Sequence, residues 1–354
     1  MAALPKIDGL IERIESAYAA RADLTPRAHL GASVLGGPCE RQLWYGFRWS
    51  GIDIQHDGRV LRLFARGQRE EDVFFDLLRL AGAIVHTHAD DGKQFRFQQS
   101  GLGGQLSGSL DGIISGLPEA PDKPHVLECK THNSKSFHKL CKEAVKESKP
   151  EHYDQMQLYM HWTGLDRALY MAVNKDDDTL YIERVAADPE RARQLVAKAT
   201  RIIEAQNPPA RISEDPAWYQ CKFCNVAKIC HGTALPVVNC RTCLHSTPLT
   251  GDRTDGAWHC AKWETEIPAD EAAKAQNCHR YIPELVTFAE CIDVYGTGDI
   301  VYECPNGEQF LNGETQPAYL STELRAIDPE MFGKIEAIKE AFDGRVVKIT
   351  GKPF

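Results

Sequence analysis

The chain has 354 residues, of which 43% are hydrophobic and 26% are charged, as in an ordinary soluble globular protein of two or three units. Its formal net charge of −9 argues against a protein that coats nucleic acids generically, but it is compatible with a locally basic channel. No run approaches the roughly 20 apolar residues of a membrane-spanning helix. Residues 1–20 carry no signal-peptide pattern, so we expect a cytoplasmic protein without membrane partners.

The first part of the chain alternates between helix and strand patterns. Apolar residues from Leu4 to Tyr18 recur at helical spacing, and glycines and a proline predict a loop over 30–39. In chain order we then predict a helix over 58–80, strands over 84–87, 94–97, 106–114 and 125–129, helices over 134–147 and 152–163, strands over 168–173 and 180–185, and a helix over 189–204. This order predicts a mixed α/β domain.

The rest of the chain has a different composition. Pro208 and Pro209 mark the end of the first domain, a cysteine-dense segment covers 221–278, and a small α/β segment follows from about residue 290. We therefore divide the chain into 1–235, a cysteine-rich module over 236–289, and a C-terminal segment over 290–354.

Three ionisable residues fall on predicted buried strands. Asp111 ends one strand pattern, and Glu128 and Lys130 are two apart on another, hence on one strand face. Buried charges without partners cost several kcal/mol, so these groups should hold a metal ion or one another. Carboxylate oxygens from Asp111 and Glu128, with the carbonyl of Cys129, suit Mg²⁺ or Mn²⁺. Lys130 would orient a water molecule or stabilise charge on a phosphate. The simpler alternative is a surface Glu–Lys pair on an edge strand.

Further residues extend this group along the chain. Gln155 and Tyr159 are four apart on a predicted helix and therefore share a face. Glu71 follows Gly67 by four residues on the long early helix, where it offers another carboxylate.

These residues resemble the motifs of PD-(D/E)xK nucleases. Asp111 with Glu128-Cys129-Lys130 is similar to the motif that names this superfamily, and Gln155 to Tyr159 is similar to the Q-x-x-x-Y motif of RecB-type nucleases. The first motif of that branch, Gly-x-x-x-His, has Glu71 in the histidine position, and lambda-type exonucleases use a glutamate in that role.

The resemblance covers residues 30–235 and implies a restriction-endonuclease-like core, with a mixed central sheet flanked by helices. It also implies metal-dependent hydrolysis of phosphodiester bonds at DNA ends. In that reaction Asp111 and Glu128 hold the metal, Glu71 assists, and Lys130 positions the nucleophile. Gln155 and Tyr159 orient the active site or the DNA strand.

A first set of cysteines brackets this region. Cys221, Cys224 and Cys230 form C-x2-C-x5-C, a spacing that in a reducing cytosol indicates metal binding, and Cys39 is the candidate fourth ligand. The arrangement resembles iron–sulfur RecB-type nucleases, including the AddB and CRISPR-associated branches, which implies a [4Fe–4S] cluster on these cysteines. Such a cluster would close a long loop and act as a structural clip. Zinc on the same thiolates is the alternative.

A second set, Cys240, Cys243, Cys260 and Cys278, predicts a separate four-thiolate site, with zinc ahead of iron. Nearby histidines at 245, 259 and 279 are candidates to replace one cysteine. The alternative is a set of buried free cysteines. The remaining cysteines show no partner pattern, and we expect core packing for them: Cys129, Cys141, Cys291 and Cys304.

Two basic stripes flank the candidate site in sequence. Arginines recur on the predicted helix over 58–80, and lysines recur from residue 135 onward as one continuous helical stripe. The members are Arg59, Arg62, Arg66 and Arg69, and Lys135, Lys139, Lys142, Lys146 and Lys149. Such stripes are often solvated helix faces, but their position favours a groove that follows DNA phosphates.

The sequence thus favours a metal-dependent DNA exonuclease acting on single- or double-stranded ends in recombination, repair, phage replication or CRISPR adaptation. The alternative is a non-catalytic DNA-binding or assembly subunit with structural metal sites. A redox protein is less favoured because no flavin or nucleotide loop is found. Without a G-x-x-x-x-G-K-[ST] loop, unwinding would require a helicase, and a recombinase or single-strand-binding protein is another expected partner.

Overall fold

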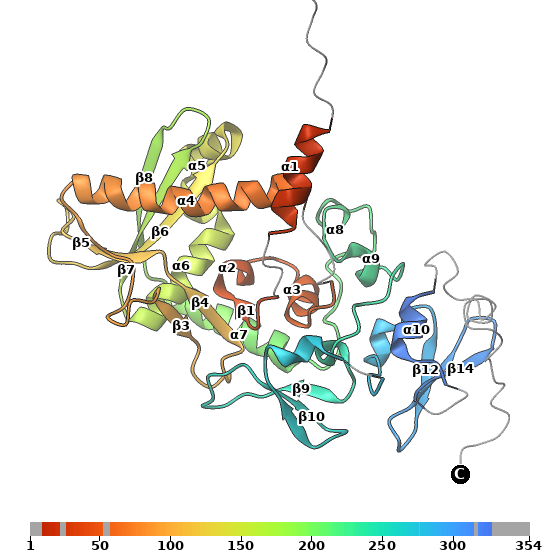
Figure 1. Cartoon of the computed structure of the whole chain (residues 1–354). Coiled ribbons are helices and arrows are strands. Elements are labelled where there is room, and N and C mark those ends of the chain that lie inside the picture. The colour runs from red at the N-terminus through yellow and green to blue at the C-terminus, as the bar shows by residue number, and fades with distance from the viewer. Residues whose placement is uncertain (1–8, 22–25, 52–56, 276, 315–317, 328–354) are drawn as a thin grey trace, which may run out of the picture.

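The computed structural model describes residues 9–21, 26–51, 57–275, 277–314 and 318–327. This part of the chain contains both helices and strands, as Figure 1 shows, so the predicted mixed α/β class is confirmed. Within the described ranges, no helix is both long enough and apolar enough to cross a membrane.

A five-stranded mixed sheet forms the centre of the first half of the chain. Its strands lie in the order β2-β5-β6-β7-β8, with β6 and β7 parallel and the other neighbours antiparallel. The bounds are β2 Ile84–His86, β5 Gly112–Ser115, β6 His125–His132, β7 Arg167–Asn174 and β8 Leu180–Ala186.

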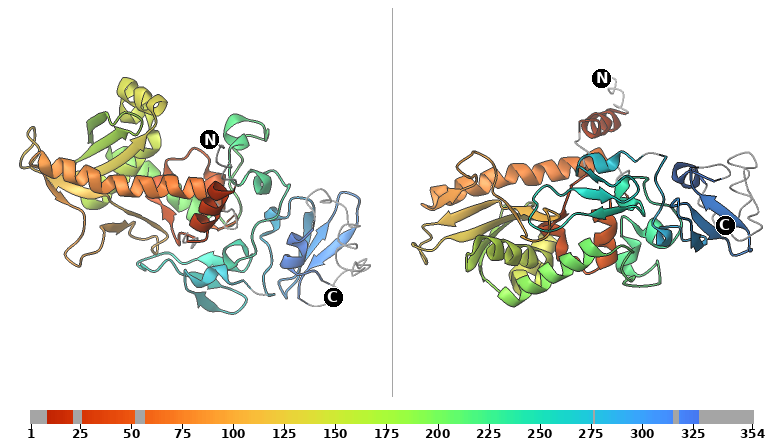
Figure 2. Two further views of the ribbon diagram at one scale, coloured as in Figure 1. Left: turned by 45° about the horizontal axis from the view of Figure 1, so that its top comes forward. Right: turned by 90° about the horizontal axis from the view of Figure 1, so that it is seen from below.

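Helices cover both faces of this sheet (Figure 2). On one face, the long helix α4 (Gly58–Leu80) packs Phe74 and Phe75 with Leu127 and Cys129 of β6. On the other face lie α5 (Ser134–Ser148) and α6 (Pro150–Thr163), and α7 (Pro189–Glu204) packs against α6. Because side chains alternate along a strand, Glu128 and Lys130 lie on the side of α6.

The ends of the long helices follow from local capping. The Asp57 side chain accepts a hydrogen bond from the backbone N–H of Val60 at 2.7 Å, and Asp188 accepts one from Arg191 at 3.0 Å. Each carboxylate satisfies a free N–H at a helix start. The bounds predicted for α4 and α7 agree with those observed.

The predicted strand over 106–114 is wrong, because the segment contributes to two sheets. β4 (Leu106–Ser109) joins a three-stranded sheet with β1 (Leu30–Gly31) and β3 (Arg96–Gln98). β5 begins only at Gly112, in the five-stranded sheet. Leu110 and Asp111 carry the chain from one sheet to the other.

The N-terminal region contains more structure than predicted. The range 30–39 includes β1 and the short helix α2 (Ala32–Leu35), and the helix α3 (Glu40–Phe47) follows it without having been predicted. Trp44 of α3 is fully buried and donates a hydrogen bond from its indole N–H to the carbonyl of Ala205 at 2.9 Å. The predicted N-terminal helix is observed as α1 (Leu10–Ala19), while Leu4 and Ile7 lie outside the described residues.

The rest of the chain contains short elements and two small antiparallel sheets. α8 (Tyr219–Lys222) and α9 (Ala227–Cys230) precede the 3-10 turn η1 (Cys240–Thr242). The first sheet comprises β9 (Ser246–Pro248), β10 (Trp258–Cys260) and β11 (Thr265–Ile267). The second comprises β12 (Glu290–Val294), β13 (Ile300–Glu303) and β14 (Gln309–Asn312), followed by α10 (Ser321–Arg325). The described residues between 290 and 327 thus form strands and one short helix, and 315–317 and 328–354 lie outside the described part.

Candidate active site and cysteine clusters

Asp111 and Glu128 meet where the two sheets join. Gly112 pairs with Leu127 in the β5–β6 ladder, so Asp111, one residue earlier, lies beside Glu128. The Asp111 carboxylate accepts a hydrogen bond from the backbone N–H of Cys129 at 2.8 Å, which fixes its position. The Glu128 side chain is fully buried, and its Oε2 atom has no hydrogen-bond partner among the described atoms.

Glu71 approaches the same point from α4. Burial, followed by the nearby charge of Asp111, raises the pKa of Glu71 to about 7. Burial also raises the pKa of Glu128 to about 8, with Asp111 and Glu71 adding to the effect and Lys130 opposing it. Three carboxyl groups therefore crowd a poorly solvated site, where a cation or shared protons must offset their repulsion.

Lys130 is the one cation in direct contact with this group among the described residues. Its ammonium forms an ion pair with Oε1 of Glu128 and donates to the carbonyl oxygen of Cys129 at 3.2 Å. Burial alone would lower the pKa of Lys130, but the charges of Glu128 and Asp111 outweigh it and raise the pKa. The Lys130 side chain is 27% exposed, so it borders the surface of the molecule. The unpartnered Glu128 oxygen and the carboxylates beside it fit a hard divalent cation.

Gln155 and Tyr159 lie on the inner face of α6 and hold the strand junction. The side-chain amide of Gln155 donates to the Tyr159 hydroxyl at 3.1 Å, and that hydroxyl donates to the carbonyl of Ser109 at 2.8 Å. A Cβ atom on Gly108 would lie 2.7 Å from the Tyr159 ring, so only glycine permits this close packing. These residues thus position the segment that carries Asp111.

Three further residues near Lys130 were not predicted. The Tyr170 hydroxyl is hydrogen-bonded to His132 at 3.0 Å and to His152 at 2.9 Å. Burial lowers the pKa of His132 to about 4 and that of His152 to about 3, so both are neutral at pH 7. One signal was present in the sequence, because His132 is two residues after Lys130 and therefore on the same strand face. Tyr170 lies opposite Glu128 only through the β6–β7 register.

The predicted arginine stripe lines an open groove of about 510 Å³ on α4. The lining residues are Tyr18, Arg59, Arg62, Leu63, Arg66, Arg69 and Lys175. Arg62 forms an ion pair with Glu15 at 3.7 Å, and Arg66 donates to the carbonyl of Lys175 at 3.3 Å. Cations gather here in a chain that is acidic overall.

The predicted lysine stripe is not continuous, and that part of the prediction is wrong. Ala144 has φ 59° and ψ 174°, which interrupts α5, and the Glu183 carboxylate accepts a hydrogen bond from the next N–H, that of Val145, at 2.8 Å. Lys135, Lys139 and Lys142 precede this kink, whereas Lys146 follows it and lies over the Tyr153 ring at 5.1 Å. Lys149 is turned inward and donates to Ser136 at 2.7 Å.

The first cysteine set lines one cavity of about 210 Å³ at the start of α3. Cys39, Cys221, Cys224 and Cys230 all border it. The sulfur of Cys39 accepts a hydrogen bond from the N–H of Gln42 at 3.4 Å, and that of Cys224 accepts one from the N–H of Val226. Such N–H groups stabilise sulfur ligands of metal centres.

The second cysteine set lines another, much smaller cavity of about 20 Å³. Cys240, Cys243, Cys260 and Cys278 border it together with His245 and His279, whereas His259 is not among its lining residues. Burial raises the pKa of Cys240 to about 12 and that of Cys243 to about 11.

In neither cysteine set do the side chains already have the spacing of metal ligands. Across the described ranges, no group of three or more His, Cys, Asp or Glu side chains is arranged to hold a metal ion. Of the other cysteines, Cys129 and Cys304 are buried as predicted and Cys291 is half-buried. Cys141 is exposed, so the prediction of core packing is wrong for it.

Comparison with known proteins finds partial likeness only. No protein-family model and no curated protein sequence matches the chain. Among solved structures, SSO0001 is 15% identical with a TM-score of 0.38, over 62% of this chain and 94% of that one. The alkaline exonuclease LHK-Exo from Laribacter hongkongensis, in complex with dAMP, is 16% identical with a TM-score of 0.37, over 54% of this chain and 90% of that one. Likeness of this degree leaves function to be argued from the chain's own residues.

Proposed function

We propose that the protein is a divalent-metal-dependent deoxyribonuclease that hydrolyses phosphodiester bonds at DNA ends. The observation that carries this proposal is the fully buried Glu128, whose unpartnered oxygen lies beside Asp111 and Glu71 while Lys130 holds its other oxygen. A structural ion pair needs one carboxylate for each cation. This site has three carboxyl groups and one lysine, which is two carboxyl groups more than an ion pair needs. The excess of oxygen ligands fits Mg²⁺ or Mn²⁺.

Each residue has a distinct role in this proposal. Asp111 and Glu128 hold the metal ion, with Glu71 and the Cys129 carbonyl as further oxygen ligands. When bound, the ion supplies Lewis-acid stabilisation of the phosphate. Lys130, a cation at neutral pH, stabilises negative charge on the phosphate or orients the attacking water. Gln155 and Tyr159 keep the Ser109 carbonyl, and therefore Asp111, in position.

Within the proposal, residues 1–235 form the nuclease unit, and the first cysteine set binds a [4Fe–4S] cluster as a structural clip. Cys39, Cys221, Cys224 and Cys230 border a cavity of about 210 Å³, which is much larger than a single ion requires. Two of the four sulfurs already accept backbone N–H bonds. Zinc on the same thiolates remains the alternative occupant. The proposed setting is DNA end processing in recombination, repair, phage replication or CRISPR adaptation.

Cleavage of end-labelled DNA tests the proposal. Purified protein with Mg²⁺ or Mn²⁺ should degrade 5′- or 3′-labelled single- or double-stranded DNA, and EDTA should stop the reaction. Asp111→Asn should lower the rate on the order of 1,000-fold, because it replaces a charged carboxylate ligand with a neutral amide. Asp122→Asn, an exposed residue between β5 and β6, is the matched control and should keep full activity. Protein that binds DNA but cleaves none with either metal would instead be the non-catalytic DNA-binding subunit.

The groove on α4 should contribute to DNA affinity through charge. The double variant Arg66→Gln with Arg69→Gln should bind a single strand about tenfold more weakly near 0.1 M salt, because two phosphate contacts are lost. The slope of log K against log salt concentration should become shallower by about 1.4. Fluorescence anisotropy in EDTA measures both quantities without cleavage. Arg253→Gln, which removes an arginine paired with Asp255 and Glu266, should change neither. An unchanged slope in the α4 variant would exclude this groove as the DNA path.

A further inference from the structure

The second cysteine set gathers residues from three separate segments around one small space. Cys240 begins η1 and Cys243 follows its end, Cys260 ends β10, and Cys278 lies in the loop that precedes the C-terminal sheet. The cavity that they border measures about 20 Å³, room for a single water-sized body. The space at the first set is about 210 Å³. The two sets therefore suit different occupants, a single ion here and a multi-atom cluster there.

The turn that carries Cys240 and Cys243 is built to present sulfur. The Asn239 side chain accepts hydrogen bonds from the N–H groups of Arg241 at 2.8 Å and Thr242 at 3.3 Å, which fixes the turn. The sulfur of Cys243 accepts backbone N–H bonds from His245 and Arg280. Backbone N–H groups directed at a sulfur offset the negative charge that it carries as a metal ligand.

Two buried arginines lie against this turn without a carboxylate partner. Arg48 and Arg241 are fully buried, and neither forms an ion pair with a described acid. Arg48 donates to the carbonyls of Arg241 at 2.9 Å and Ala205 at 3.0 Å. Arg241 donates to the carbonyls of Phe47 at 3.0 Å and Ala28 at 2.9 Å.

Both guanidinium groups are cations at neutral pH. Stacking relieves part of the cost, because the Arg241 guanidinium lies 3.7 Å from the Trp49 ring centroid and 5.0 Å from that of Trp258. Carbonyls and aromatic rings are only partial counter-charges, and two uncompensated cations in the interior are costly.

We propose that Cys240, Cys243, Cys260 and Cys278 bind one structural zinc ion, and that Arg48 and Arg241 neutralise the two excess negative charges of the resulting zinc tetrathiolate. Four thiolates and one Zn²⁺ leave two negative charges, which matches the two buried arginines. The sulfurs must close in on the ion to reach zinc–sulfur bonding distance. The site is independent of the proposed nuclease chemistry.

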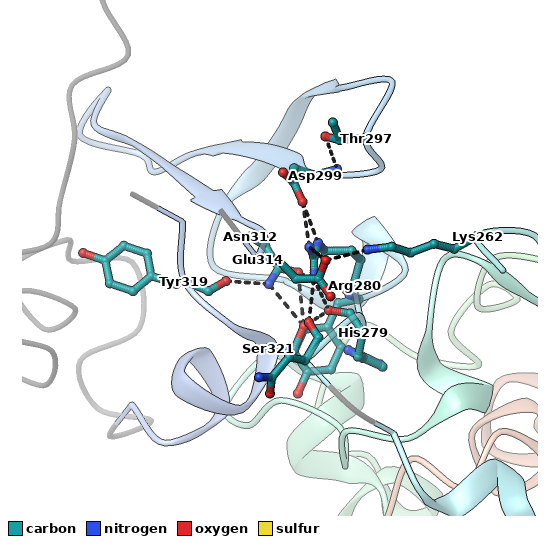
Figure 3. A network of polar contacts seen from close by, with 11 residues as sticks. Lys262, His279, Arg280, Thr297, Asp299, Asn312, Glu314, Tyr319 and Ser321 are labelled. Atoms are coloured by element: carbon teal, nitrogen blue, oxygen red, sulfur yellow. Dashed lines mark hydrogen bonds and ion pairs between the residues drawn. The ribbon is translucent and has the colours of Figure 1, made fainter. Parts of the chain in front are cut away.

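The zinc ion would add a link between parts of the chain that backbone hydrogen bonds already join, since the N–H of Leu244 donates to the carbonyl of Arg280 at 2.8 Å and the N–H of Ile282 donates to the carbonyl of Thr242 at 3.2 Å. Beside Cys278, the Arg280 guanidinium donates to the Asp299 carboxylate at 2.7 and 3.0 Å, and Ser321 donates to the carbonyl of His279 at 3.0 Å (Figure 3). These bonds fasten the Cys278 loop to the C-terminal sheet. On the other side, Arg241 fastens the Cys240–Cys243 turn to the end of α3.

Metal analysis of the full-length protein tests the proposal. Protein expressed with iron and zinc in the medium should contain one zinc per chain by mass spectrometry, apart from any iron. Cys260→Ser and Cys278→Ser should each lose the zinc, whereas Cys291→Ser, a half-buried cysteine outside the set, should keep it. Cys221→Ser should lose iron and keep zinc, which separates this site from the first set. Wild-type protein with no more zinc than the Cys260→Ser variant overturns the proposal.

Cobalt and the arginines test the ligand set and its charge balance. Cobalt in place of zinc should give the absorption of a tetrahedral four-sulfur site, and the spectrum of a three-sulfur, one-nitrogen site would instead assign His245 or His279 as a ligand and overturn the four-thiolate assignment. Arg241→Met should accelerate zinc loss to a chelator by 10- to 100-fold. Arg241→Lys should restore part of the loss by retaining the charge. Arg41→Met, which removes another buried arginine bonded to carbonyls, should have no effect. Equal zinc retention in the wild type, Arg241→Met, Arg241→Lys and Arg41→Met would show that Arg241 does not neutralise the charge of the zinc site.

Discussion

Replacing Glu128 with glutamine should abolish DNA cleavage without lowering the free energy of unfolding. Glu128 is fully buried, and burial with the charges of Asp111 and Glu71 raises its pKa to about 8. The uncharged amide lacks the negative charge and the second oxygen of the carboxylate and binds a divalent cation more weakly, so the cleavage rate should fall on the order of 1,000-fold. The same change removes a buried carboxylate that its neighbours repel, so stability measured without metal should be unchanged or higher.

Lys130→Met should also abolish cleavage, but with the opposite effect on stability. It leaves the buried Glu128 carboxylate without its cation, which should lower the free energy of unfolding by about 3 kcal/mol. Urea unfolding in EDTA and single-turnover cleavage measure the two effects side by side. Lys123→Met, an exposed lysine before β6, should change neither quantity. Equal losses of stability in Glu128→Gln and Lys130→Met would show that these residues form an ordinary ion pair, without an excess of negative charge.

A large loss of stability is also expected when the first cysteine set is changed. Cys221→Ser should remove the iron and the brown colour and lower the free energy of unfolding by up to about 5 kcal/mol, because a cluster that joins Cys39 to Cys221 closes nearly the whole nuclease domain into a loop. Cys39→Ser should behave in the same way. The double variant, with Cys39→Ser and Cys221→Ser together, should be no less stable than either single variant, because each single change already removes the cluster.

Metal content and thermal melting of the wild type, the two single variants and the double variant check this prediction. Cys141→Ser, an exposed cysteine, should keep its iron and its melting temperature. A colourless wild-type protein with zinc bound to this set and the same losses in the variants would assign zinc in place of the cluster. Additive losses of stability in the double variant would show that the cysteines do not act as a single clip.

Local patterns predicted those elements whose boundaries are set locally. α4 and α7 follow an aspartate cap and a clear apolar periodicity, and both are found where predicted. α3 was missed because it has only eight residues, too few for a helical periodicity to stand out in the sequence. The helix is stabilised by tertiary contacts, such as the hydrogen bond from the Trp44 indole to the carbonyl of Ala205. The kink at Ala144 has a similar origin, since the carboxylate that satisfies the next N–H belongs to Glu183 on β8.

The part of the candidate site that depends on the spacing of residues within one strand or one helix could be predicted from the sequence. Glu128 and Lys130 share a strand face because they are two apart, and Gln155 and Tyr159 share a helix face because they are four apart. Tyr170 joins them only because β6 and β7 are parallel in one particular register, which no local pattern encodes. The break of the predicted strand at Asp111 is also non-local, because an alternating pattern does not specify which neighbouring strand it will pair with.

The buried Arg48 has a consequence for how the chain is made. Its hydrogen-bond partners are residues 157 and 193 positions later in sequence, and the carbonyl of the adjacent Trp49 is bonded by Asn239, 190 positions later. At typical rates of synthesis, the ribosome needs roughly 10 to 40 s to supply such partners. During that interval the aromatic segment around α3 has been made but has nowhere to bury its arginine. The nascent N-terminal region therefore depends on late-arriving chain, and protein shortened before residue 239 should be a substrate for chaperones and proteases.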